Sequence, residues 1–230
     1  MTPPTVPELR IPAGGQFGYR AGFHRPRVLV EVRHERVVGA GLHLFVAPNG
    51  AGKTTLIRTL AGLNDPIRGA VTATGQIHYF SDELRADPEL SARTFFRAWF
   101  KGEKLTLAEN LAATLQLNLK TPIGKLSRGN RQKVLLILAE TQIHQSAASL
   151  LLMDEPLSGL DRETRAQVAA IWAASRPSVL RLIIIHELES VHDADSLLTI
   201  AGGELRHSVA ESGRSWLETY TSLQSAPASL

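Results

Sequence analysis

The amino-acid sequence predicts an α/β fold that combines a mainly parallel sheet with an N-terminal antiparallel β subdomain and a short helical subdomain. Three features of its 230 residues support this prediction. Short β-branched runs separated by glycine and charged residues occupy Phe17 to Val46, which is typical of antiparallel strands. Leu, Ala, Glu, Lys and Arg recur at helical spacing over residues 83–147. Apolar runs at 150–153 and 182–185 are typical of strands buried on both faces of a parallel sheet.

The expected domain boundaries follow these changes of pattern. Residues 1–16 are rich in proline and glycine, so we expect an irregular N-terminal lead. Residues 17–210 form one domain into which the helical subdomain at about 83–147 is inserted. A strand at LLLMD, a helix at about 162–174 and the strand VLRLIII follow the insert. Residues 211–230 carry four large side chains at helical spacing, which predict a C-terminal helix packed on its own domain and then a tail: Trp216, Leu217, Tyr220 and Leu223.

Composition narrows the classes of function. A hydrophobic share of 43% with 20% charged residues is typical of a globular protein and excludes disorder throughout. The apolar runs are shorter than the ~20 residues of a membrane-spanning helix, and the start MTPPTVPELR does not resemble a secretory signal, so we expect a cytoplasmic location. The absence of cysteine excludes disulfides and thiolate metal sites. The basic residues between Arg20 and Arg36 are interspersed with acids, which favours a solvated strand face over a nucleic-acid surface.

A glycine-rich loop is the first candidate site. The segment HLFVAPNGAGKTTLIRTLAG places glycines between a buried strand and a helix, followed at once by lysine and two threonines. Glycines let backbone N–H groups converge on a polyphosphate, the lysine reaches its terminal phosphates, and a hydroxyl can bind Mg²⁺. We therefore expect a phosphate-loop NTPase core whose ATP contacts are Asn49, Gly50, Ala51, Gly52, Lys53, Thr54 and Thr55, with Thr54 also on Mg²⁺.

Two points limit what the loop shows by itself. Ala47 stands where the strict pattern has its first glycine, which is harmless if Ala47 keeps a negative φ. The alternative is a tight strand-to-helix turn that carries an exposed lysine.

Two carboxylates follow a buried strand about a hundred residues later, in LLLMDEPLSGLD. Ligands of open α/β sheets bind beyond the carboxyl ends of the strands, so we expect Asp154 and Glu155 beside the glycine-rich loop. Asp154 is then a Mg²⁺ ligand, and Glu155 orients a water and accepts its proton. The alternative is a strand end with two solvated acids before a proline turn. The next strand delivers His186 to the same edge, although an isolated histidine there is more often a helix cap or a surface residue.

The segment LSRGNRQKV, residues 126–134, completes a set of motifs that resembles the ATPase domain of ABC transporters over about residues 17–207. In order, the set is APNGAGKTT, LSRGNRQK, LLLMDEP, SGLD and IIIH, and the second piece is similar to the family's LSGGQ signature. The resemblance implies a head-to-tail dimer in which ATP lies between the glycine-rich loop of one copy and Ser127 and Gly129 of the other. It also implies that His186 contacts the γ-phosphate. The dimer, homomeric or heteromeric, would drive transport through a separate integral membrane subunit at the inner face of the membrane, with no nucleic-acid partner.

Some positions depart from the family pattern or leave a choice open. Asp82 stands where the family usually has glutamine, and we expect it to bind Mg²⁺ or water. Either Tyr19 or Phe23 supplies the aromatic ring that the family stacks on adenine. The stretch DPELSARTFFRAWF is similar to drug- and lipid-exporter ATPases and favours an exporter type. The alternative function is a soluble ABC-type ATPase, for example one that serves iron–sulfur assembly, whereas a small-molecule kinase would lack LSRGN and SGLD.

Overall fold

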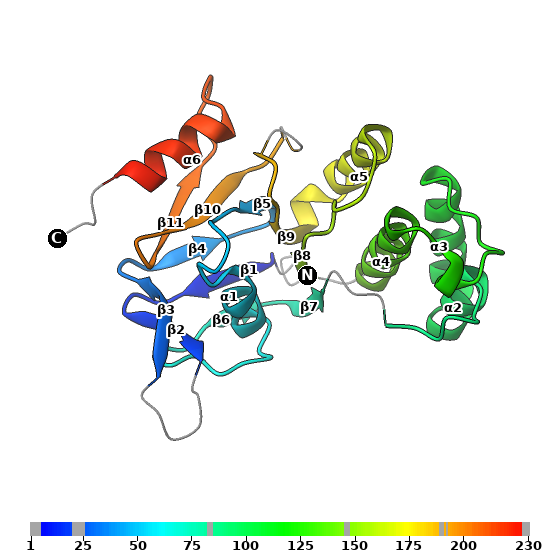
Figure 1. The fold of residues 1–230 in the computed structure, drawn as a ribbon, viewed down its shortest axis with the longest axis horizontal. Helices are drawn as coiled ribbons and strands as arrows, with labels where there is room; N and C mark the ends of the chain where they lie inside the picture. The colour runs from blue at the N-terminus through cyan, green and yellow to red at the C-terminus, as the bar shows by residue number, and fades with distance from the viewer. Residues whose placement is uncertain are drawn as a thin grey trace, which may run out of the picture. The chain divides into compact units, whose positions relative to one another are not determined.

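The chain is described by a computed structural model for residues 6–19, 26–81, 85–144, 148–188, 191 and 193–226 (Figure 1). It divides into two compact units. The first comprises residues 1–79, 147–154 and 176–230, and the second comprises residues 80–146 and 155–175.

An eight-stranded sheet dominates the first unit, with strand order β2-β3-β11-β10-β5-β9-β8-β7. Its central strands β10, β5, β9 and β8 are parallel, whereas β2 with β3 and β10 with β11 form antiparallel pairs. The mainly parallel sheet expected from the apolar runs is therefore confirmed. The strand bounds are β2 Gly15–Tyr19, β3 Arg27–Val32, β5 Gly41–Phe45, β7 Gln76–Phe80, β8 Ser149–Asp154, β9 Val179–Ile184, β10 Ser196–Ala201 and β11 Glu204–Val209.

A smaller antiparallel sheet has the order β4-β1-β6, with β1 at Glu8–Ile11, β4 at Arg36–Val38 and β6 at Thr72–Thr74. The structure thus differs from the expected irregular lead over residues 1–16. Leu9 and Ile11 alternate with polar residues and are fully buried, so this short segment gains a core face once β4 and β6 pair with it. The flanking prolines hide that alternation in the sequence.

The helix that follows the glycine-rich loop, α1 at Lys53–Leu60, packs against β2 and β8. Its apolar face buries Leu56, Ile57 and Leu60 in the core of the first unit. The helix ends at Leu60 with Ala61 as its C-cap, and Gly62 follows with a φ of 73°, a left-handed conformation that suits glycine after a helix.

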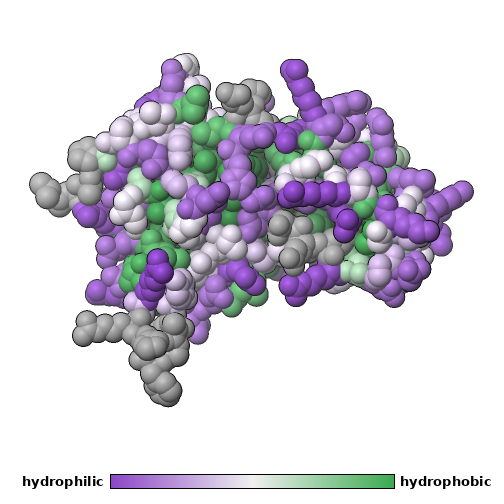
Figure 2. All heavy atoms as spheres, in the orientation of Figure 1, coloured by the Kyte–Doolittle hydropathy of each residue, from purple (hydrophilic) through white to green (hydrophobic). Residues whose placement is uncertain are grey.

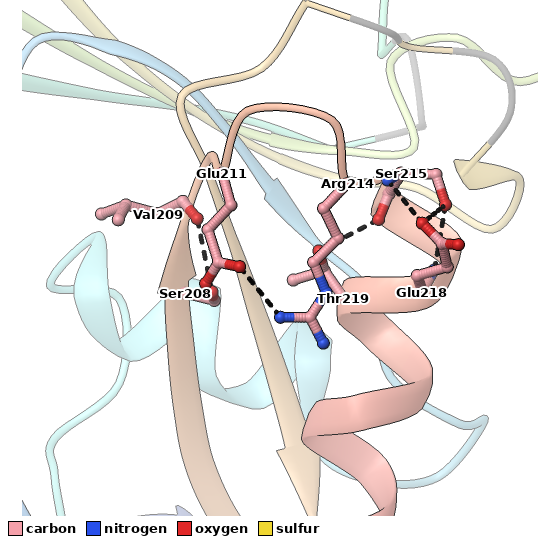
Figure 3. Close-up of polar contacts among 7 residues, drawn as sticks. All are labelled: Ser208, Val209, Glu211, Arg214, Ser215, Glu218 and Thr219. Atoms are coloured by element: carbon pink, nitrogen blue, oxygen red, sulfur yellow. Dashed lines mark hydrogen bonds and ion pairs between the residues drawn. The ribbon is translucent and has the colours of Figure 1, made fainter.

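The C-terminal helix α6, Trp216–Ser225, packs against β10 and β11 (Figure 1). Its start is fixed by a capping box in which the Ser215 hydroxyl accepts from the Glu218 N–H and the Glu218 carboxylate accepts from the Ser215 N–H (Figure 3). Its end is held by Arg206 of β11, which donates to the Ala226 carbonyl at 2.8 Å. Gln224 also donates to Thr199 Oγ1 of β10 at 2.7 Å.

The described residues of the second unit form the α-helices α2 Ala92–Trp99, α3 Gly102–Thr114, α4 Arg128–Ile143 and α5 Arg162–Ala174. The first three belong to the expected insert, and α5 joins them in the same compact unit. Helix α3 packs against α4. A buried hydrogen bond of 2.9 Å from the Trp172 indole to Glu140 Oε1 ties α5 to α4.

The face drawn in Figure 2 carries mostly hydrophilic residues with small apolar areas between them. In the part of the chain that the structure describes, no helix has both the length and the apolar character required to cross a membrane.

Candidate nucleotide-binding site

The glycine-rich loop joins the carboxyl end of β5 to the first residue of α1. Gly50 and Gly52 have φ values of 77° and 104°, which side chains rarely tolerate. A Cβ on Gly52 would lie 3.0 Å from the Leu29 Cβ, so the chain here needs glycine for space as well as for conformation. Among the described residues other than glycine, only Gln116 and Glu155 have a positive φ, so Ala47 keeps the negative φ on which its tolerance depends.

Lys53 lies inside this loop and is not the exposed lysine of a simple turn. Its side chain is 8% exposed, and its ammonium donates to the Ala47 carbonyl at 2.7 Å and to the Pro48 carbonyl at 3.3 Å. The positive charge is thereby held against the loop at the N-terminus of α1, where the helix dipole also favours an anion. A polyphosphate seated on the loop would meet both.

Thr54 and Asp154 are brought together although they are 100 positions apart. The Thr54 hydroxyl donates to Asp154 Oδ2 at 3.0 Å. Asp154 is the last residue of β8, against which α1 packs. A hydroxyl and a carboxylate therefore meet beside the glycine-rich loop.

The sheet register explains why His186 belongs to the same edge. Phe45 at the end of β5 pairs with Ile184 at the end of β9, and Ile184 pairs with Asp154 at the end of β8. His186 follows Ile184 by two residues and is exposed. The glycine-rich loop, Asp154 and His186 thus leave three adjacent parallel strands at one edge.

Glu155 comes directly after Asp154 and begins the part of the second unit that contains α5. It is half-buried and has a φ of 49°, the left-handed conformation that non-glycine residues rarely adopt. Its carbonyl accepts from the Ser158 N–H at 3.1 Å, so a tight turn follows it.

Ser127 and Gly129 lie in the second unit, at the start of α4. Ser127 is the N-cap residue, and its hydroxyl accepts from the Asn130 N–H at 3.2 Å. The side chain is exposed, and Gly129 is half-buried. This geometry is an ordinary helix cap that also leaves a helix N-terminus open to a ligand.

A hollow of about 440 Å³ adjoins the glycine-rich loop in the first unit. Tyr19 is 45% exposed beside it, and the Arg27 guanidinium lies 5.8 Å from the centre of its ring. Of the two aromatic candidates, Tyr19 therefore lies at the loop, whereas Phe23, like Asp82, falls outside the described residues. The residues that line the hollow are Gly18, Tyr19, Thr55, Asn64, Asp65 and Ile67.

The sequence did not identify Asn64, Asp65 and Ile67 as part of this site. The segment Gly62 to Pro66 carries a strong helix-stop pattern, and that pattern alone explains its residues. The structure shows that they line a hollow together with Thr55 and with Gly18 and Tyr19 of β2.

Comparison with known proteins identifies the family of the chain. A family model described as ABC transporter matches residues 39–158, or 120 of the 230 residues. The cytochrome c biogenesis ATP-binding export protein CcmA of Sphingopyxis alaskensis is 30% identical over 157 residues, which cover 66% of this chain and 78% of CcmA.

A second relative is much longer than this chain. The mycobactin import ATP-binding/permease protein IrtB of Mycobacterium tuberculosis is 31% identical over 190 residues, which cover 70% of this chain and 31% of IrtB. The matched segment thus spans about a third of the length of that relative.

The fold is shared with a solved dimeric ATP-binding cassette in a post-hydrolysis state bound to ADP and Pi. The TM-score is 0.69 at 15% identity, and the match covers 87% of this chain and 98% of that one. Since the family model matches more than half of the sequence and CcmA is matched over most of its length, the chain belongs to the ABC transporter family.

Proposed function

We propose that the chain hydrolyses ATP as the nucleotide-binding subunit of an ABC transporter and drives transport through a separate membrane subunit. The observation that carries the proposal is the shared sheet edge, where the glycine-rich loop with Lys53 and Thr54, Asp154 and His186 follow three adjacent parallel strands. Relatives named for import and for export both support a transport role, and IrtB, named as an ATP-binding/permease protein, supports a membrane partner. That partner would hold the chain at the inner face of the membrane.

Each residue of the site has a separate proposed role in hydrolysis. Backbone N–H groups from Asn49 to Thr55 and the Lys53 ammonium bind the β- and γ-phosphates, and Glu155 orients the attacking water and accepts its proton. His186 contacts the γ-phosphate from the neighbouring strand. Phosphoryl transfer needs positioning and charge neutralisation rather than covalent chemistry, and these residues are the chain's proposed contribution on the nucleotide's own side.

A Mg²⁺ ion fits the donors that are present. Thr54 Oγ1 and Asp154 Oδ2 are hard oxygen donors placed within 3.0 Å of each other, the type of ligand that Mg²⁺ prefers. Asp82 is proposed as a further ligand of the ion or of its water. With these ligands, a bound ion would supply charge neutralisation for the phosphates.

A second copy of the chain completes the site from the other side. The N-terminus of α4, with the Ser127 hydroxyl and the Gly129 N–H, offers hydrogen-bond donors to the γ-phosphate of ATP on the first copy. The dimeric cassette of the same fold supports this arrangement. ATP then closes the dimer, because its binding energy is complete only in the closed state.

The test is the Glu155→Gln variant. We expect ATP to bind with unchanged affinity while kcat falls by roughly 10²- to 10⁴-fold, the usual effect of removing a positioned base. A turnover equal to that of the wild-type chain would refute the role of Glu155.

The same variant tests the dimer. On size exclusion with ATP and Mg²⁺ it should elute as a dimer, and without nucleotide as a monomer. A monomer under both conditions would contradict the homodimer and indicate a different ATPase chain as the partner. Exposed Glu187→Gln provides the matched control, with wild-type turnover.

A further inference from the structure

The backbone of Glu155 is held in an unfavourable conformation. A φ of 49° is strained for a residue with a Cβ and persists only where neighbouring contacts determine it. The turn that follows supplies one such contact, from the Ser158 N–H to the Glu155 carbonyl. Further contacts come from helix α4.

Gln132 on α4 supplies two of these contacts. Its side chain is buried, at 5% exposure, and its amide nitrogen donates to the Pro156 carbonyl at 2.9 Å and to the Glu155 carbonyl at 3.4 Å. Both partners are carbonyl oxygens, so only the NH₂ group of the amide can satisfy them. One buried side chain thus binds two consecutive peptide groups, which fixes the orientation of the backbone at Glu155.

The first turns of α4 contact the same loop at two more points. The Arg128 guanidinium donates to Ser158 Oγ at 2.9 Å. A Cβ on Gly129 would lie 2.5 Å from the Gly159 carbonyl oxygen, so the helix and the loop approach closely enough to require glycine. Gln132 lies about one helical turn beyond these residues, on the same face of α4.

We infer that Gln132 is a positioning residue for Glu155 in ATP hydrolysis. It contacts the backbone of Glu155 and not the reacting atoms, and it holds the backbone angle from which the catalytic carboxylate projects. The inference rests on the proposed function, because it presupposes that Glu155 is the catalytic base. It predicts that Gln132 affects kcat and leaves nucleotide affinity unchanged.

The test replaces Gln132 with methionine, which keeps the length and helix preference of the side chain but removes both donors. Since a displacement near 1 Å at a reacting group can cost about 10²-fold in rate, we expect kcat to fall by about 10- to 100-fold. The dissociation constant for ATP should stay within about twofold, because the hydrogen bonds of Gln132 run to the Glu155 and Pro156 carbonyls. The matched control is Gln142→Met on the same helix, at a half-buried position, with wild-type kcat.

A double variant separates positioning from a general structural effect. In the Glu155→Gln background there is no carboxylate to position, so adding Gln132→Met should lower the residual rate by less than about twofold. An equal loss in both backgrounds, or a parallel loss of ATP affinity, would overturn the inference. If the methionine variant does not fold, Gln132→Asn, which keeps the amide but is too short to reach, serves instead and must show the same loss of kcat.

The results also distinguish this inference from the proposed function. A wild-type chain without ATPase activity, or a Glu155→Gln variant with full activity, would contradict the proposed function itself. A wild-type rate for Gln132→Met beside an impaired Glu155→Gln would overturn only the role of Gln132.

Discussion

Lys53 combines a buried charge with a position inside the glycine-rich loop. Its replacement by alanine removes a charge-assisted hydrogen bond to phosphate worth about 1.5–3 kcal/mol, so we expect ATP affinity to fall by at least 10- to 100-fold. Isothermal titration calorimetry measures this loss. Exposed Lys120→Ala is the control and should bind ATP as the wild type does. Wild-type affinity in the Lys53 variant would refute the phosphate-binding role of the loop.

Gly52 and Gly50 offer a matched pair in the same loop. Both have a positive φ, but a Cβ on Gly52 would press on Leu29 and Val30, whereas a Cβ on Gly50 would meet no atom within 4 Å. Gly52→Ala should therefore lower the free energy of unfolding by about 1–3 kcal/mol, and Gly50→Ala by less. Urea unfolding without nucleotide measures both. Equal losses would contradict the steric explanation.

Helix α6 depends on its capping box at Ser215 (Figure 3). Ser215→Ala removes the hydroxyl that accepts from the Glu218 N–H, which should cost about 1 kcal/mol of helix stability. Hydrogen exchange at the α6 amides should become correspondingly faster, while exchange in α1 stays unchanged. Ser222→Ala, at an exposed position within α6, is the control and should not accelerate exchange.

The elements also show how far the sequence determines the fold. The strands β8 and β9 and the helix after the glycine-rich loop could be predicted because each carries its own signal: an uninterrupted apolar run, or Gly-Lys-Thr followed by helical spacing. Strand β1 could not, because four residues between prolines become a strand only when β4 and β6, distant in the chain, pair with them.

Some residues of the candidate site could likewise be predicted from the sequence, and others could not. The positions of Asp154 and His186 were predictable because each follows an apolar run that is typical of a buried strand. The roles assigned to them stay predictions. The position of Gln132 was not predictable, because nothing in the sequence distinguishes it from other helical glutamines. Only the structure shows that it is buried against the loop at Pro156. Asn64 and Asp65 had a complete local explanation as turn residues, which concealed their place at the hollow.

The stability of the whole molecule should depend on two histidines of the main sheet, His43 on β5 and His207 on β11. Burial lowers the pKa of His43, which contacts Ser196 Oγ at 2.7 Å and the Gly39 carbonyl at 2.9 Å. Burial, together with the charges of His43 and Arg36, lowers the pKa of His207 to about 4.

These shifts give a direction with pH. The unfolded chain takes up protons at its histidines below about pH 6.5, whereas folded His207 does so only near pH 4. The unfolded state therefore binds more protons in this window, so the free energy of unfolding is complete above about pH 6.5 and falls as the pH is lowered toward 4. Urea midpoints at pH 7 and pH 5 measure the change. His207→Gln should reduce it, while exposed His34→Gln should not.

Three adjacent strands are paired in register at Phe45, Ile184 and Asp154. This register restricts how far Asp154 can move. Sliding β8 by one residue would turn Asp154 to the opposite face of the sheet, and sliding it by two would carry its carboxylate about 7 Å along the strand. The spacing between Thr54 and Asp154 therefore cannot be tuned in small steps by the sheet. The strand register can change only in whole residues, so we expect any fine adjustment to a bound nucleotide to come from the segments that follow the strands.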